Sequence, residues 1–178
     1  MTVEKLTKKL EDVVNRLTVL ENTLAQLSDR VKDAEDIEEI KQLQRRYVNA
    51  LIKADWDDVM ECFAEDAVFY AYLKQEEIKG KDLIEKWFRE SIARNHVGQE
   101  GDFVVHPIIS VNGDKATGSW LLYMMYCYPR TGQSLFWVQG FYDMQYVRVN
   151  GEWKFSYFKW SERMGLPGGG PPKGLFEK

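Results

Sequence analysis

Apolar residues recur along the first 34 positions at alternating intervals of four and three, with no glycine or proline among them. Six leucines and two valines make up the series: Leu6, Leu10, Val13, Leu17, Leu20, Leu24, Leu27 and Val31. This spacing is typical of the apolar seam of a coiled coil. A lone helix would leave the narrow seam in water, so residues 1–35 are predicted to form a heptad helix that pairs with copies of the chain. Packing of this helix across its own domain uses the same pattern and stays open as an alternative.

A second helical segment is expected after the heptads. Asp36 followed three residues later by Glu39 forms a capping box, which predicts a new helix with apolar positions from Ile37 to Leu51. Asp55 is placed to cap a short third helix through Phe63. A strand over 67–72 and an amphipathic helix over 81–94, preceded by a glycine, are predicted next.

The second half of the chain reads as sheet. Long apolar runs at 103–111, 116–128, 135–149 and 153–160 are separated by turn sequences, which predicts an antiparallel meander. Helices are the available cover for one face of such a sheet, so the fold class is α+β, with a curved antiparallel or mixed sheet wrapped on helices over 36–164. Residues 165–178 hold five glycines and three prolines and are expected to form a flexible tail.

Composition narrows the class of partner. The net charge of −4 and the scattered basic residues give no stripe for a nucleic-acid backbone, so no nucleic-acid partner is expected. The two cysteines, Cys62 and Cys127, stand in no metal or disulfide pattern and are expected to be reduced core residues. No apolar leader or membrane-length run is present, so a cytoplasmic protein without a membrane partner is predicted. No cluster of histidine, cysteine, aspartate or glutamate residues has the spacing of metal ligands, so no metal is expected. No cofactor is expected either.

Several short motifs follow one another along the chain: Tyr47 with Trp56 nine residues on, Phe63–Ala67, Pro107–Ala116, Trp120–Leu122 and Asn150–Trp153. In this order they resemble the SnoaL-like branch of the nuclear transport factor two superfamily over about residues 36–163. The Ile-Glu-Glu-Ile-Lys-Gln-Leu run and the heptad helix before it most resemble the bile-acid dehydratases, with scytalone dehydratase and lindane dehydrochlorinase more distant. The resemblance implies a cone-shaped α+β barrel with a hydrophobic pocket, a homotrimer, and a cofactor-free elimination or isomerisation.

Only some of the catalytic residues of relatives have a counterpart in this sequence. Tyr47 matches the helix tyrosine of relatives, but their aspartate five residues later is Ile52 here. The relatives' histidine falls on or near Asp102, and a second strand carboxylate of the dehydratases falls on Met124. Proton abstraction beside a carbonyl needs a base and an oxyanion donor, so these departures leave the acid–base pair to other residues.

Four residues are candidates for proton transfer. Tyr47 is either an oxyanion donor or a core tyrosine, and Asp102 is either a strand-entry residue or a substitute for the relatives' histidine. Asp143, inside an apolar run, is expected at a rim, paired with an arginine, or serving as an acid–base group. Pro107 is expected to hold His106 in extended geometry, on the same face as Ile108, as a base or as a structural histidine.

The chain is rich in aromatic residues, which either fill its core or line a pocket suited to a flat apolar ligand. Ten residues are candidates for the substrate pocket: Ile52, Trp56, Phe69, Trp87, Phe103, Trp120, Met124, Trp137, Phe141 and Trp160. The leading functional hypothesis is a dehydratase-type lyase or an isomerase acting on a steroid-like, polyketide or aromatic carbonyl compound. The alternative is a non-catalytic ligand-binding or assembly protein of the same fold.

Overall fold

The computed structural model describes residues 2–71, 74–93, 101–127 and 134–167, and at 126–127, 134–136 and 166–167 it describes the backbone. Most of the predicted tail, residues 168–178, lies outside the described part. The elements are α1 (Val3–Ile52), α2 (Trp56–Glu61), β1 (Phe63–Ala71), β2 (Glu76–Lys79), α3 (Lys81–Trp87), the π-helix η1 (Phe88–Ile92), β3 (Gly101–Asn112), β4 (Lys115–Cys127), β5 (Ser134–Val149) and β6 (Glu152–Pro167).

Helix α1 runs without a break through its 50 residues. The predicted start of a new helix at Asp36 is therefore wrong. A capping box acts only where the preceding chain is not helical, and with no glycine or proline near this point the backbone hydrogen bonds continue through it. Contacts between residues divide the chain into two compact units, Met1–Glu38 and Glu39–Lys178. The helix α2 begins as predicted, because the Asp55 carboxylate accepts a hydrogen bond from the backbone N–H of Asp58 at 3.3 Å.

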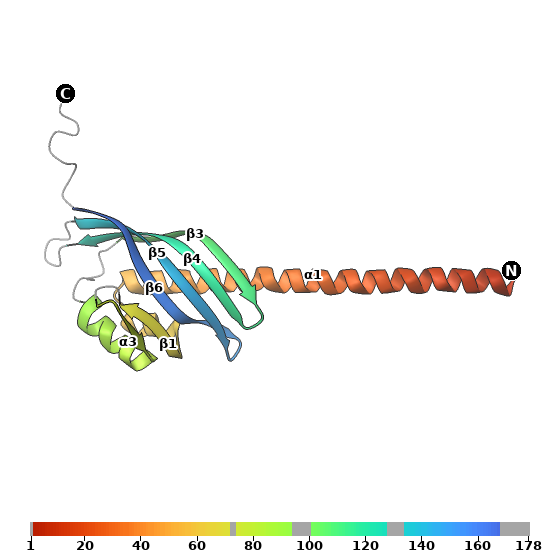
Figure 1. The fold of residues 1–178 in the computed structure, drawn as a ribbon, viewed down its shortest axis with the longest axis horizontal. Coiled ribbons are helices and arrows are strands. Elements are labelled where there is room, and N and C mark those ends of the chain that lie inside the picture. Colours follow the sequence, from red (N-terminus) through yellow and green to blue (C-terminus); the bar gives the residue numbers. More distant parts are fainter. Residues whose placement is uncertain (1, 72–73, 94–100, 128–133, 168–178) are drawn as a thin grey trace, which may run out of the picture. The chain divides into compact units, whose positions relative to one another are not determined.

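The sheet has six strands in the order β2-β1-β6-β5-β4-β3, so it ends in two free edges. The predicted α+β class, with a curved sheet wrapped on helices, is confirmed, and the sheet is not closed because β2 and β3 do not pair. The meander from β3 to β6 is antiparallel as predicted, and its strands lie side by side in Figure 1. Strand β1 pairs in parallel with β6, which makes the sheet mixed. The short β2 was not expected from the sequence.

Aromatic rings fill the space between the C-terminal part of α1 and the sheet. The Tyr47 ring centroid lies 5.4 Å from that of Phe155, 5.2 Å from Phe158 and 6.3 Å from Tyr142. Phe88 of η1 packs on Phe69 of β1 with a centroid separation of 5.2 Å. These side chains are buried, so the aromatic residues in this region form the core of the fold.

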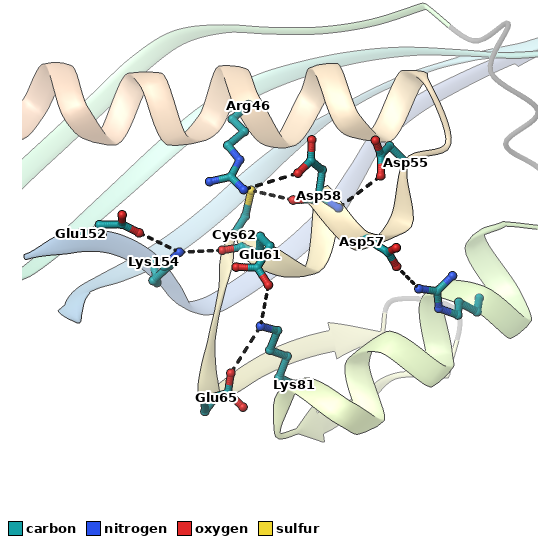
Figure 2. A network of polar contacts seen from close by, with 11 residues as sticks. Arg46, Asp55, Asp57, Asp58, Glu61, Cys62, Glu65, Lys81, Glu152 and Lys154 are labelled. Atoms are coloured by element: carbon teal, nitrogen blue, oxygen red, sulfur yellow. Dashed lines mark hydrogen bonds and ion pairs between the residues drawn. The ribbon is translucent and has the colours of Figure 1, made fainter. Parts of the chain in front are cut away.

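A network of ion pairs and hydrogen bonds joins α1, α2, α3, β1 and β6 around Cys62 (Figure 2). Arg46 lies 3.5 Å from Asp58, and Lys81 contacts both Glu61 and Glu65. Cys62 is fully buried beneath it and its thiol donates to the Asp58 carbonyl oxygen at 3.4 Å. Burial raises the pKa of this thiol from 9.0 to about 12, so Cys62 is an unreactive core residue, as expected. The side chain of Cys127 lies outside the described part.

Candidate functional site

A cleft of about 490 Å³ lies between α1 and the edge strand β3. Helix α1 supplies one wall, β3 supplies the other, and one side chain of β4 contributes. The lining residues are Lys41, Gln44, Arg45, Val48, Asn49, Asp102, Phe103, Val104, Val105, Pro107 and Trp120. The volume is within the usual range for small-molecule sites, about 300–1,000 Å³.

The helical repeat places the cleft residues of α1 on one side. Lys41, Gln44, Arg45 and Val48 follow the spacing of residues that share a helix face. The neighbouring face carries Tyr47 and other buried residues, and packs into the aromatic core. One helix therefore positions both the core and the cleft wall.

A β-bulge in β3 decides which side chains of that strand face inward. Val105 is opposite Leu121 and Ile108 is opposite Ser119, so β3 has one residue more than β4 between these pairs. His106 lies in this bulge with a φ of 53°, and its side chain is exposed. The expectation that Pro107 holds His106 in extended geometry is wrong, because the bulge requires the left-handed region.

The bulge also reverses the alternation of side chains along β3. Before it, the even-numbered Asp102 is buried and Phe103 is exposed. After it, Ile108 is exposed and the odd-numbered Ile109 packs against the core. The side chains of His106 and Ile108 are both exposed, which is consistent with the prediction that they share a face. His106 is absent from the residues that line the cleft, and its catalytic role stays a prediction.

Asp102 is the one carboxylate among the residues that line the cleft. Its side chain lies at the start of β3 and the residue is 8% exposed. Asp102 is the register partner of Met124, so the two positions that the sequence resemblance aligns with polar catalytic groups are adjacent across the β3–β4 ladder. Met124 itself is buried in the apolar core. Of the four candidates for proton transfer, the structure brings Asp102 to the cleft.

Gln44 lines the cleft but was not among the residues predicted from the sequence. The residue is 1% exposed, and neither its amide nitrogen nor its amide oxygen has a hydrogen-bond partner in the described part of the chain. A buried amide without a partner costs about 1–3 kcal/mol. The signal was available, since Gln44 stands between Ile40 and Val48 in a row of residues spaced by four, where an apolar residue is expected.

The cleft combines positive charge with apolar surface. Lys41 and Arg45 contribute two cations against the single carboxylate of Asp102. The remaining wall is largely apolar and includes Val48, Val104 and Trp120. Such a lining suits a ligand that has an apolar body and an anionic group, although the whole chain carries a net charge of −4.

Tyr47 and Trp120 belong to the core beside the cleft. Tyr47 is 2% exposed and is not among the cleft residues. The Trp120 indole N–H donates to the Tyr146 hydroxyl oxygen at 2.8 Å, which fixes the ring that borders the cleft. Burial raises the pKa of the Tyr146 hydroxyl well above its ordinary value, so this group remains a neutral phenol.

Asp143 lies on the opposite face of the sheet. Its register partners are Ser119 on β4 and Lys159 on β6, and its side chain is exposed. It lines a shallow depression of about 350 Å³ together with Tyr157. Burial raises the pKa of Tyr157, and the nearby charges of Glu77, Tyr70 and Asp143 raise it further. Asp143 and Asp102 therefore lie on opposite faces of the sheet. The catalytic role of Asp143 stays a prediction.

The ten pocket candidates are divided among three environments. Phe103 and Trp120 line the cleft. Trp137 and Phe141 are 42% and 37% exposed. Core or partly buried positions hold the remaining six: Ile52, Trp56, Phe69, Trp87, Met124 and Trp160. Contact of these residues with a substrate stays a prediction.

Within the described residues, no group of three or more histidine, cysteine, aspartate or glutamate side chains is placed to hold a metal ion. In the same part of the chain, no helix combines the length and the apolar character that a membrane span requires.

The amino-acid sequence matches the profile of a known protein family. The profile of the SnoaL-like domain matches residues 32–159. A comparison with curated proteins found no match.

Solved structures of similar fold include enzymes and an association domain. A scytalone dehydratase-like protein from Novosphingobium aromaticivorans has a TM-score of 0.66 and 20% identity, over 81% of this chain and 97% of that one. A hexachlorocyclohexane dehydrochlorinase, LinA type 2, has a TM-score of 0.67 and 17% identity, over 80% and 97%. A protein from Xanthomonas campestris described as a calcium/calmodulin-dependent protein kinase II association domain has 0.60 and 18%, over 70% and 86%. Identities this low support a shared fold and do not by themselves carry a function over to this chain.

Proposed function

Because the chain belongs to the SnoaL-like family, we propose that its α1–β3 cleft binds a small carbonyl compound and catalyses a cofactor-free elimination of the lyase type. The observation that carries the proposal is the buried carboxylate of Asp102, the one acidic group in the cleft lining. Relatives of the same fold named as dehydratase-like and dehydrochlorinase proteins support this class of reaction.

The proposed reaction is the loss of water from a β-hydroxy carbonyl compound. The Asp102 carboxylate removes a proton from the carbon beside the carbonyl, and the electron pair of that C–H bond forms the new double bond. The hydroxyl group leaves from the β-carbon and takes the proton from the Asp102 carboxylic acid as it becomes water. One residue thus acts as base and then as acid, so no external proton donor is required.

The remaining cleft residues favour a particular substrate class. The Lys41 and Arg45 cations suit a carboxylate or another anionic group on the substrate. The Gln44 amide has an N–H that can donate to the carbonyl oxygen as negative charge develops on it. Phe103 and Trp120 supply apolar surface for a ring. An aromatic or polyketide acid fits this combination better than a neutral steroid does.

The Asp102→Asn variant tests the proposal. An amide cannot accept the proton, so turnover of an aromatic β-hydroxy keto acid should fall about a hundredfold or more, while binding persists. The measurement is the absorbance of the conjugated product, with binding followed by calorimetry.

Asp143→Asn is the matched control, because it makes the same chemical change on the other face of the sheet. It should leave turnover within about twofold of the wild-type rate. Loss of turnover in Asp143→Asn with full activity in Asp102→Asn would refute the assignment. The same assay applied to His106→Ala and Tyr47→Phe tests the two sequence candidates that do not line the cleft.

A ligand-binding protein without catalysis is the second candidate. It is favoured by Ile52 and Met124, which stand where relatives carry carboxylates, and by the burial of Met124 in the apolar core. For this function, a bound aromatic acid would be recovered chemically unaltered after long incubation, and Asp102→Asn would bind it as the wild-type chain does. Release of the unsaturated product by the wild-type chain would exclude this candidate.

A further inference from the structure

The first unit of the chain presents an apolar stripe that the described structure leaves exposed. Within helix α1, Val3 and the eight heptad residues are between 43% and 81% exposed. The repeat extends over about 48 Å of helix, at about 1.5 Å per residue. More than four consecutive heptads exceed the length at which such a pattern indicates a coiled coil.

The heptad positions can be assigned from the spacing of three after Val3 and of four after Leu6. Positions a are Val3, Leu10, Leu17, Leu24 and Val31, and positions d are Leu6, Val13, Leu20, Leu27 and Ala34. The g positions, which flank this seam on one side, are Lys9, Arg16, Thr23 and Arg30. The e positions on the other side are Thr7, Val14, Glu21, Ser28 and Glu35.

The charges beside the seam are segregated by position. Every charged residue at g is basic, and every charged residue at e is acidic. In a parallel coiled coil, a g residue meets the e residue five positions later on its neighbour, so Arg16 meets Glu21 and Arg30 meets Glu35. In an antiparallel pair, g meets g and e meets e, which brings like charges together. Self-association in parallel is therefore attractive and the antiparallel arrangement is repulsive.

From this pattern we infer that residues 3–35 form a parallel, in-register coiled coil with a second copy of this chain. The apolar a and d residues bury each other, and the Arg16–Glu21 and Arg30–Glu35 pairs across the interface set the orientation. The complementarity is between the chain and itself, since each copy supplies both the basic and the acidic flank. This inference is independent of the chemistry proposed for the cleft.

Disulfide trapping in the full-length chain tests the orientation. Leu10→Cys puts a thiol at an a position near one end of the seam, where parallel, in-register partners place the two thiols opposite each other. Lys8→Cys, at the outward f position two residues away, is the matched control. Under a glutathione redox buffer, Leu10→Cys should form a covalent dimer at least about tenfold more completely than Lys8→Cys. The wild-type chain gives the background from its native cysteines.

Mixing experiments distinguish the alternatives. Preferential crosslinking between Leu10→Cys and Leu27→Cys chains would show an antiparallel pair and overturn the inference. Equal, low crosslinking of Leu10→Cys and Lys8→Cys would show that the stripe does not bind a second copy, and would also overturn it.

Charge reversal supplies a second test that does not depend on a thiol. The variant with Arg16→Glu and Arg30→Glu has only acidic charges at these flanking positions, and the variant with Glu21→Arg and Glu35→Arg has only basic ones. Each variant alone should dissociate about tenfold more readily in sedimentation, whereas an equimolar mixture should recover the wild-type affinity by forming mixed assemblies. Circular dichroism checks that each variant keeps its helix content. Unchanged sedimentation in both variants and in the mixture would contradict the inference.

Discussion

The buried amide of Gln44 lowers the stability of the folded chain. It is buried among core and cleft side chains without a hydrogen-bond partner in the described structure. Folding removes water from both polar atoms of this amide, and no hydrogen bond within the described structure replaces the bonds to water. In the proposed function, a ligand repays part of this cost by bonding to the amide.

The Gln44→Met variant should separate the two effects. Methionine has nearly the same shape and no group that needs a hydrogen bond, so the free energy of unfolding should rise by about 1 kcal/mol or more. Binding of the aromatic acid should weaken at the same time. Urea denaturation measures the first quantity and calorimetry the second.

Gln42→Met is the control for this variant, because Gln42 is an exposed glutamine on the same helix. It should change the free energy of unfolding by no more than about 0.5 kcal/mol. A loss of stability in Gln44→Met would mean that the amide gains more from its surroundings than it loses.

At the scale of elements, β3 is the strand whose geometry most affects the site. The bulge at His106 turns Asp102 and Val104 inward on one side and Ile109 inward on the other. A regular strand would point Asp102 and Ile109 to opposite faces, because side chains alternate along a strand. The cleft and the core under β3 can therefore coexist only with the bulge.

His106→Gly should make the bulge more favourable. Glycine adopts a φ of about 53° without the clash that a Cβ atom causes, so the free energy of unfolding should rise by up to about 1 kcal/mol. His106→Ala keeps the clash and should give no such gain. Thermal unfolding of both variants measures the difference.

This pair of variants also bears on chemistry. If the exposed imidazole takes no part in turnover, His106→Gly and His106→Ala will both retain the wild-type rate. Equal loss of activity in the two variants would restore His106 as the base.

At the scale of the whole molecule, two buried acidic groups couple stability to alkaline pH. Burial raises the pKa of Cys62 from 9.0 to about 12 and that of Tyr146 above its ordinary value of 10.0. In each case the charged form is favoured by the unfolded chain. The stability that these neutral groups contribute is thus complete below pH 9, and is lost as the pH rises toward and through their folded-state values.

The free energy of unfolding should consequently fall between pH 9 and pH 12, with Cys62 contributing about 1.4 kcal/mol per pH unit to the slope. In Cys62→Ala the slope should be shallower from pH 9 upward, whatever the variant loses in absolute stability. In Tyr146→Phe it should become shallower only above about pH 10. Urea denaturation at each pH measures the slopes, and identical slopes in the wild-type chain and both variants would contradict this account.

The sequence alone determined the features that depend on local pattern. Heptad spacing predicted a helix before position 35, the Asp55 cap predicted α2, and alternation with turn residues predicted the strands from β3 to β6. These signals work because hydrogen bonding in a helix, capping and tight turns involve residues only a few positions apart. The order of several such motifs was also enough to indicate the SnoaL-like family.

The tertiary structure decided what depends on residues far apart in the chain. The parallel pairing of β1 with β6 and the open edges of the sheet are properties of strand pairing across long separations. The extra residue at His106 depends on how β3 pairs with β4, which the pattern of β3 alone does not show. The same holds for the site, because burial of Gln44 and Asp102 in one cleft follows from the way α1 lies against β3. Local periodicity does not predict these features, because contacts between separate elements stabilise them. The sequence pattern does not show which elements make those contacts.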